Sequence, residues 1–232
     1  MRRPRGGIRR RRIRYGDDPS QFGVLFGEGP VAVVIHGGFW KATYDLSLMD
    51  ALCMDLASRG WAAWNVEYRR LGNGGGVPAT LEDVAAAIDH LAELAPDHGL
   101  DLSRVVTIGH SAGGHLATWA ALRHDAQVPI TAMVSQAGVL DLARARELRL
   151  SDGVVGRFLG GRPTSEASPI ELLPLRVPAL LTHGAQDDIV PLEISERFAA
   201  ASGATLHVDP DAGHFEHLDP THPLWRAVLA WL

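Results

Sequence analysis

The chain has a single cysteine, Cys53, among its 232 residues. An internal disulfide needs two thiols, so none can form within this chain. No cysteines and histidines have the spacing of a structural zinc site, and we expect neither a metal nor an organic cofactor. Cys53 is therefore predicted to be a small buried hydrophobic residue on a helix.

Long apolar runs are also missing. The longest early run, Val31–Ile35, is too short to cross a bilayer. A secretion signal needs about 7–15 apolar residues after its charged start. Here the sequence Tyr-Gly-Asp-Asp-Pro-Ser follows the N-terminal arginines at 15–20 instead. These patterns predict a cytoplasmic protein with no membrane partner.

Acidic residues are absent from positions 1–14, which carry eight arginines. The whole chain has a net charge of −5, so the remainder carries −5 − 8 = −13. No aromatic or motif context in this segment supports nucleic-acid binding. We interpret residues 1–14 as an Arg-rich, disordered tail and residues 15–232 as one folded domain.

The remainder alternates between strand-like and helix-like segments. Apolar runs predict buried strands, and the segments between several of them have helical spacing. Strands that are separated by helices build a mostly parallel sheet with right-handed crossovers. The sequence thus predicts a single-domain α/β fold with helices flanking a central sheet. The strands are expected at 31–36, 61–68, 104–110, 130–136, 178–183 and 204–208.

Residues 138–177 interrupt this alternation. The segment is rich in glycine and proline and has one short helical stretch, at 142–148. An excursion of this kind beyond the strand ends commonly shapes a substrate pocket. We predict a small cap here.

The motif Gly-His-Ser-Ala-Gly at 109–113 lies between a predicted strand and a predicted helix. A nucleophilic serine at such a sharp turn needs neighbours without bulky side chains, so that strand and helix can approach each other. The following helix begins with a partial positive charge that favours a developing oxyanion. Ser111 is therefore the predicted nucleophile, and a plain glycine-flanked turn is the alternative.

A second glycine motif, His-Gly-Gly-Phe-Trp at 36–40, ends the first long strand. Oxyanion holes of this kind use the amide after the nucleophile and another amide from an early loop. We predict that Ala112 provides the first amide and Gly38 or Phe39 the second. The alternative is a tight turn with an anchoring aromatic residue.

The acid and the base of a catalytic triad are expected late in the chain. Asp187 follows a predicted strand, and Asp188 fits the same role one position off. His214 lies on a loop after the last predicted strand, next to a glycine. The order Ser111, Asp187, His214 is the one that this type of fold uses.

Several other residues near these motifs remain open. Trp40, Phe158 and Phe215, together with Phe39, could line an apolar substrate pocket or belong to the core. Glu67 is expected at the same sheet edge without an assigned role, and an ion pair to Arg69 or Arg70 is the plain alternative.

The chain resembles α/β-hydrolases from about residue 15 to residue 232. More narrowly, it is similar to bacterial small esterases and arylformamidases, including kynurenine formamidase-like and feruloyl or acetylxylan esterase-like proteins. The motifs that carry the resemblance begin at Tyr15, His36, Asn65 and Gly109. The resemblance implies a small-molecule ester substrate, or an N-formyl arylamine as the alternative. A non-catalytic ligand-binding protein of the same fold is the alternative from another class.

Overall fold

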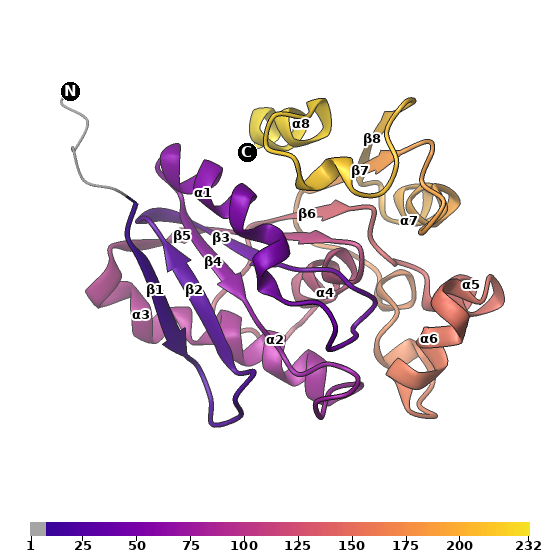
Figure 1. Cartoon of the computed structure of the whole chain (residues 1–232), viewed down its shortest axis with the longest axis horizontal. Helices are drawn as coiled ribbons and strands as arrows, with labels where there is room; N and C mark the ends of the chain where they lie inside the picture. The colour runs from indigo at the N-terminus through magenta and orange to yellow at the C-terminus, as the bar shows by residue number, and fades with distance from the viewer. Residues whose placement is uncertain (1–7) are drawn as a thin grey trace.

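The computed structural model describes residues 8–232, and its centre is one eight-stranded sheet (Figure 1). The strands are β1 (Arg10–Arg14), β2 (Phe22–Phe26), β3 (Gly29–Ile35), β4 (Ala62–Val66), β5 (Leu100–His110), β6 (Ala132–Gln136), β7 (Ala179–Gly184) and β8 (Thr205–Asp209). Their spatial order is β1-β2-β4-β3-β5-β6-β7-β8. Only the β1–β2 and β2–β4 pairs are antiparallel. The predicted mostly parallel sheet is confirmed.

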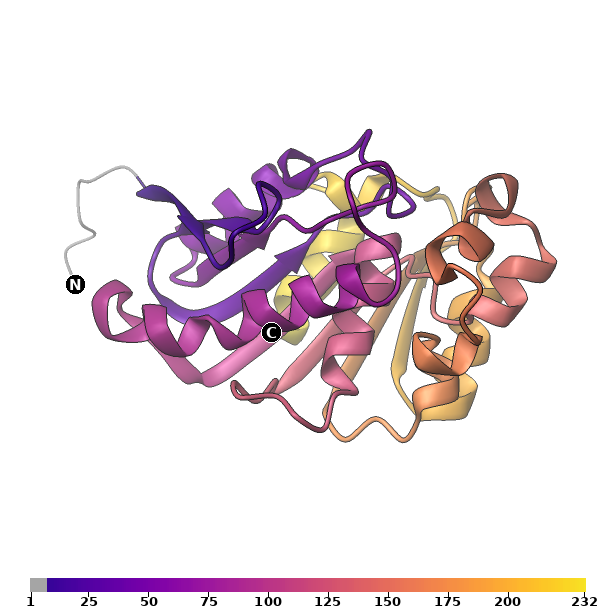
Figure 2. The same cartoon turned by 90° about the horizontal axis from the view of Figure 1, so that it is seen from below.

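Helices cover both faces of the sheet (Figure 2). One face carries α1 (Asp50–Ser58) and α8 (Pro223–Trp231); the other carries α2 (Ala79–Asp89), α3 (Leu91–His98), α4 (Ala112–Ala121) and α7 (Glu193–Ser202). Cys53 is buried on α1, as predicted. Within residues 8–232, no helix combines the length and apolar character that a bilayer crossing requires.

Strand β3 illustrates why these segments lie at the centre. Val31, Val33 and Ile35 pack into the core on one face of the sheet. Ala32 and Val34 pack into the core on the other face. Since successive side chains of a strand point to opposite faces, a strand buried on both faces must be a continuous apolar run.

The N-terminal arginines require a correction. Residues 10–14 were expected to lie in a disordered tail, but they form β1 along β2. The guanidinium of Arg12 lies 3.7 Å from the centre of the Phe22 ring, and Arg10 forms an ion pair with Asp50. The strand is an edge strand, where exposed charged side chains are common. Residues 1–7 lie outside the described residues.

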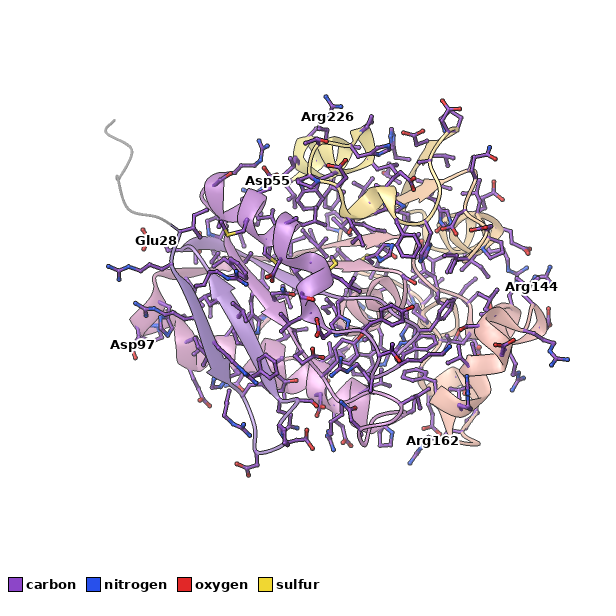
Figure 3. All side chains as sticks on the ribbon, viewed as in Figure 1. Glu28, Asp55, Asp97, Arg144, Arg162 and Arg226 are labelled. Carbon is purple, nitrogen blue, oxygen red and sulfur yellow. The ribbon has the colours of Figure 1, made fainter. Side chains whose placement is uncertain are left out.

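The cap is present where the sequence predicted it. It contains α5 (Leu142–Glu147), α6 (Leu150–Leu159) and the short 3-10 helices η2 (Thr164–Glu166) and η3 (Pro169–Leu172). Figure 3 marks this end of the molecule with Arg144 and Arg162, and the opposite end with Glu28 and Asp97. Lys41 Nζ donates a hydrogen bond to Ser151 Oγ at 2.7 Å, which ties the cap to the loop after β3.

The polar residues singled out by the sequence follow the carboxyl ends of parallel strands. Glu67 follows β4 directly, and Ser111 follows β5. Asp187 comes after β7, and His214 after β8. Because these strands run in the same direction, all four loops lie at one edge of the sheet, where α/β folds bind ligands.

Candidate active site

Ser111 lies in a strained turn between β5 and α4. Its backbone has φ 57° and ψ −119°, a region that residues with side chains rarely adopt. The flanking glycines are required by close packing. A Cβ on Gly109 would lie 2.0 Å from the Gly113 carbonyl oxygen, and one on Gly113 would lie 2.0 Å from the Ile35 carbonyl oxygen. This is the strand-turn-helix arrangement that a nucleophilic serine needs.

Asp187 and His214 form a close pair. His214 Nδ1 lies 2.6 Å from Asp187 Oδ2, and both side chains are buried. The other carboxylate oxygen, Oδ1, accepts hydrogen bonds from the amides of Ile189 (2.9 Å) and Val190 (2.8 Å). Burial alone would raise the pKa of Asp187, but hydrogen bonds from His183 and His214 outweigh it and hold the pKa well below its usual range. Asp187 is therefore a carboxylate that fixes the imidazole through Nδ1.

Asp188, the alternative acid, does not contact His214. Its residue is exposed, and among residues 8–232 its side chain makes no hydrogen bond or ion pair. The structure therefore brings Asp187 and not Asp188 to His214.

Sequence reasoning missed His183, which also contacts Asp187. Its Nε2 lies 3.3 Å from Asp187 Oδ2 and donates to the Val190 carbonyl oxygen at 2.8 Å. A carbonyl can only accept, so Nε2 carries the proton and Nδ1 accepts from Ser195 Oγ at 2.8 Å. His183 lies four residues before Asp187 in the same strand-end motif. That short spacing is the sequence feature that could have indicated the contact.

His110 connects the nucleophile turn to the loop of the base. Its Nε2 donates to the His214 carbonyl oxygen at 2.8 Å, and the two ring centres are 4.7 Å apart. Burial, followed by the proximity of His214, lowers the pKa of His110 to about 3, so its ring is neutral. Within the described residues, the Ser111 and His214 side chains make no direct hydrogen bond. Such contacts often tighten only when substrate binds.

The loop after β3 lies directly against Ser111. A Cβ on Gly37 would be 3.0 Å from Ser111 Cβ. Gly38 and Phe39 both have positive φ angles, of 107° and 50°. Among residues 8–232, the amides of Gly38, Phe39 and Ala112 donate to no other protein group. These three predicted oxyanion donors are therefore free to bind a ligand oxygen.

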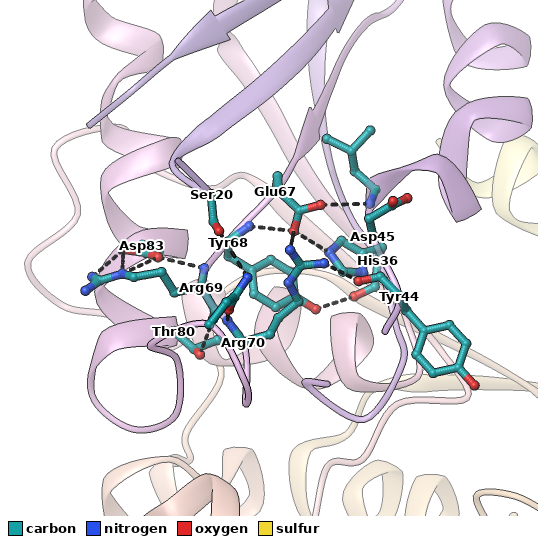
Figure 4. A network of polar contacts seen from close by, with 12 residues as sticks. Ser20, His36, Tyr44, Asp45, Glu67, Tyr68, Arg69, Arg70, Thr80 and Asp83 are labelled. Carbon is teal, nitrogen blue, oxygen red and sulfur yellow. Dashed lines mark hydrogen bonds and ion pairs between the residues drawn. The ribbon is translucent and has the colours of Figure 1, made fainter. Parts of the chain in front are cut away.

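A network of buried polar side chains lies behind this loop (Figure 4). Glu67 pairs with Arg70 at 3.2 Å and with His36 at 3.0 Å. Arg69 pairs with Asp83 instead, at 2.6 Å. Of the two ion pairs considered for Glu67, the one to Arg70 is confirmed.

The predicted pocket residues divide into two groups. Trp40 and Phe158 are 0% exposed and stack on each other, with ring centres 4.2 Å apart. They offer no surface to a ligand, so their prediction as pocket lining is corrected to core packing between cap and sheet. Phe215 is 59% exposed and lies edge-on to His214, with ring centres 5.3 Å apart. It remains the predicted residue that can contact a substrate beside the base.

Comparison with known proteins identifies a family for this chain. Residues 26–201, about three quarters of the chain, match the family BD-FAE. The chain belongs to this family. Esterase LipC of Mycobacterium tuberculosis is 30% identical, over 99% of this chain and 66% of LipC. Esterase LipQ of the same organism is 28% identical, over 74% of this chain and 45% of LipQ. The chain thus spans less than two thirds of either relative.

A solved structure shows the same fold in this BD-FAE chain. Esterase B from Lactobacillus rhamnosis has a TM-score of 0.83 and 23% identity, over 100% of this chain and 86% of that chain. The predicted α/β-hydrolase fold is therefore confirmed.

Proposed function

We propose that this chain is a serine hydrolase that cleaves small carboxylic esters through an acyl-enzyme intermediate. The observation that carries the proposal is the 2.6 Å contact between His214 and Asp187 at the same sheet edge as the strained Ser111 turn. Membership of the BD-FAE family supports it, as do relatives that are named esterases.

Acylation begins with proton transfer from Ser111 Oγ to the neutral Nε2 of His214. Oγ bonds to the ester carbonyl carbon, and the carbonyl π electrons move to the oxygen. The amides of Ala112 and of Gly38 or Phe39 donate hydrogen bonds to that oxyanion. When the carbonyl re-forms, the bond to the leaving oxygen breaks, and the alcohol departs with the proton from His214.

Deacylation repeats these steps with water. His214 accepts a proton from water as the hydroxide oxygen bonds to the acyl carbon. The second tetrahedral intermediate then collapses, and Ser111 Oγ leaves with the proton from His214. Asp187 stays ionised throughout and stabilises the imidazolium through Nδ1, which its lowered pKa permits.

Active-site labelling and turnover test this proposal together. We expect a fluorophosphonate probe to label the purified chain and Ser111→Ala to abolish both labelling and p-nitrophenyl acetate hydrolysis. N-formylkynurenine, run in parallel, distinguishes an arylformamidase, which would turn over the formamide more efficiently than the ester. A chain that stays unlabelled and hydrolyses neither substrate would be a non-catalytic ligand-binding protein.

A further inference from the structure

Glu67 is a buried carboxylate with no assigned part in the reaction. It is 2% exposed. Four nitrogen atoms lie within hydrogen-bond distance of its two oxygens (Figure 4). They are His36 Nε2 at 3.0 Å, the Leu46 amide at 3.1 Å, the Tyr68 amide at 3.0 Å and Arg70 Nη2 at 3.2 Å. One side chain at the end of β4 thus holds His36 and Leu46, the two ends of the segment 36–46. That segment, called here the oxyanion loop, carries the amides of Gly38 and Phe39.

The same network also holds the middle of the oxyanion loop. Arg70 Nη1 donates to the Tyr44 carbonyl oxygen. The Tyr44 side chain packs so closely on Gly38 that a Cβ there would lie 2.6 Å from it. Arg70 is itself held by Glu67, so the carboxylate also restrains the loop through this second contact.

His36 restrains one peptide group of the oxyanion loop, the one between Gly37 and Gly38. Its Nδ1 lies 2.8 Å from the Gly37 carbonyl oxygen, while its Nε2 faces Glu67. In a planar trans peptide, the carbonyl oxygen and the next amide hydrogen point in opposite directions. Holding the Gly37 oxygen therefore fixes the direction of the Gly38 N–H. Tyr68 completes the contact, because its hydroxyl donates to the His36 carbonyl oxygen at 2.8 Å and its ring stacks on the imidazole.

We propose that Glu67 is a positioning residue that, through His36, Leu46 and Arg70, aims the Gly38 amide at the oxyanion of the reacting ester. This role rests on the esterase function proposed above. Donors that are fixed before the reaction need no reorganisation when charge develops, so the benefit is realised in the transition state more than in substrate binding.

Asp83 offers a matched control in the same network. It is also a buried carboxylate, at 0% exposed, and Figure 4 shows it against Arg69. Its partners are Arg69, through the backbone amide and the guanidinium, and Gln21. Among residues 8–232 it makes no hydrogen bond to the oxyanion loop. Replacing Asp83 removes a buried charge without releasing Gly38.

The test compares Glu67→Gln with Asp83→Asn in the full chain, using p-nitrophenyl acetate. For Glu67→Gln we expect kcat to fall about 10- to 100-fold with KM nearly unchanged. The affinity for phenylboronic acid, which forms a tetrahedral adduct with the serine, should fall by a similar factor. For Asp83→Asn, kcat and the boronic acid affinity should stay within about twofold of wild type, whatever its thermal stability.

Tyr68→Phe keeps the test decisive if Glu67→Gln does not fold. It removes only the hydroxyl contact to His36, and we expect a threefold to tenfold loss of kcat, about the worth of one hydrogen bond. Equal losses in Glu67→Gln and Asp83→Asn, a change in KM alone, or an unchanged Tyr68→Phe would overturn the positioning role. An active wild type with any of these results leaves the esterase function intact, whereas an inactive wild type refutes both.

Discussion

Asp187, the acid of the proposed proton-transfer chain, contacts two histidines through one carboxylate oxygen. Oδ2 accepts from His214 Nδ1 at 2.6 Å and also lies 3.3 Å from His183 Nε2. A second donor withdraws charge from that oxygen and prevents the carboxylate from rotating. The charge that Asp187 presents to His214 therefore depends on His183 and, through the proton on Nε2, on Ser195.

His183→Leu tests this influence. Without the second donor, Asp187 holds the proton of His214 more strongly, so the acid limb of the kcat/KM profile should move to higher pH. We expect a shift of about half a pH unit to one unit, measured with p-nitrophenyl acetate. Two other titratable groups lie near this pair, His110 and His217. Both are held neutral by burial, which lowers their pKa values.

The matched variant is His183→Gln, whose amide nitrogen can take the place of Nε2 and donate to Asp187. It should restore the wild-type profile. If both variants lose activity at every pH without moving the acid limb, His183 supports the fold and does not tune Asp187.

At the level of elements, the sequence predicted the parallel strands well because a local run of apolar residues marks each of them. Five consecutive apolar residues in β3 identify a strand buried on both faces, without any knowledge of its neighbours. Strand β1 has no such pattern, since its sequence is Arg-Arg-Arg-Ile-Arg. Its stability comes from pairing with β2 and from arginines over aromatic rings, contacts that only the folded chain defines.

The candidate site also contains residues that local sequence patterns mark and contacts that only the folded chain defines. Ser111, Asp187 and His214 could be predicted because short motifs and a fixed chain order mark them. The contact between Glu67 and His36 joins residues 31 apart in sequence, and that between His110 and His214 joins residues 104 apart. No local spacing encodes such contacts. The same applies to the stacking of Trp40 on Phe158, which removed both from the predicted pocket.

For the whole molecule, buried neutral histidines tie stability to pH. Burial lowers the pKa of His115 from 6.5 to about 4 and that of His110 from 6.5 to about 3. As the pH falls below 6.5, these two histidines bind protons in the unfolded chain, whereas in the folded chain they stay neutral until the pH is much lower. The stabilisation is therefore complete above about pH 6.5 and is lost progressively toward pH 4. Asp187 adds nothing in this window, because its lowered pKa affects stability only below 3.8.

We predict that the free energy of unfolding falls between pH 6.5 and pH 5, and that His115→Gln weakens this dependence. The glutamine keeps a donor for the Ala167 carbonyl oxygen, which His115 contacts at 2.8 Å, but it cannot be protonated. Each such histidine contributes about 1.4 kcal/mol per pH unit. Urea unfolding at several pH values measures the slope. His124→Gln, at an exposed position, should leave it unchanged; an unchanged slope in His115→Gln would contradict the assignment.

We propose that Ser111, His214 and Asp187 act as one proton-transfer chain, so replacing Asp187 should have a far larger effect than replacing its neighbour Asp188. The measurement is kcat/KM for p-nitrophenyl acetate with Asp187→Asn and Asp188→Asn. Asp187→Asn should lose about 10⁴-fold, because an amide cannot hold the imidazole in the required tautomer. Asp188→Asn should stay within about twofold of wild type. Equal rates for the two variants, or a larger loss in Asp188→Asn, would show that Asp187 is not the acid of this chain.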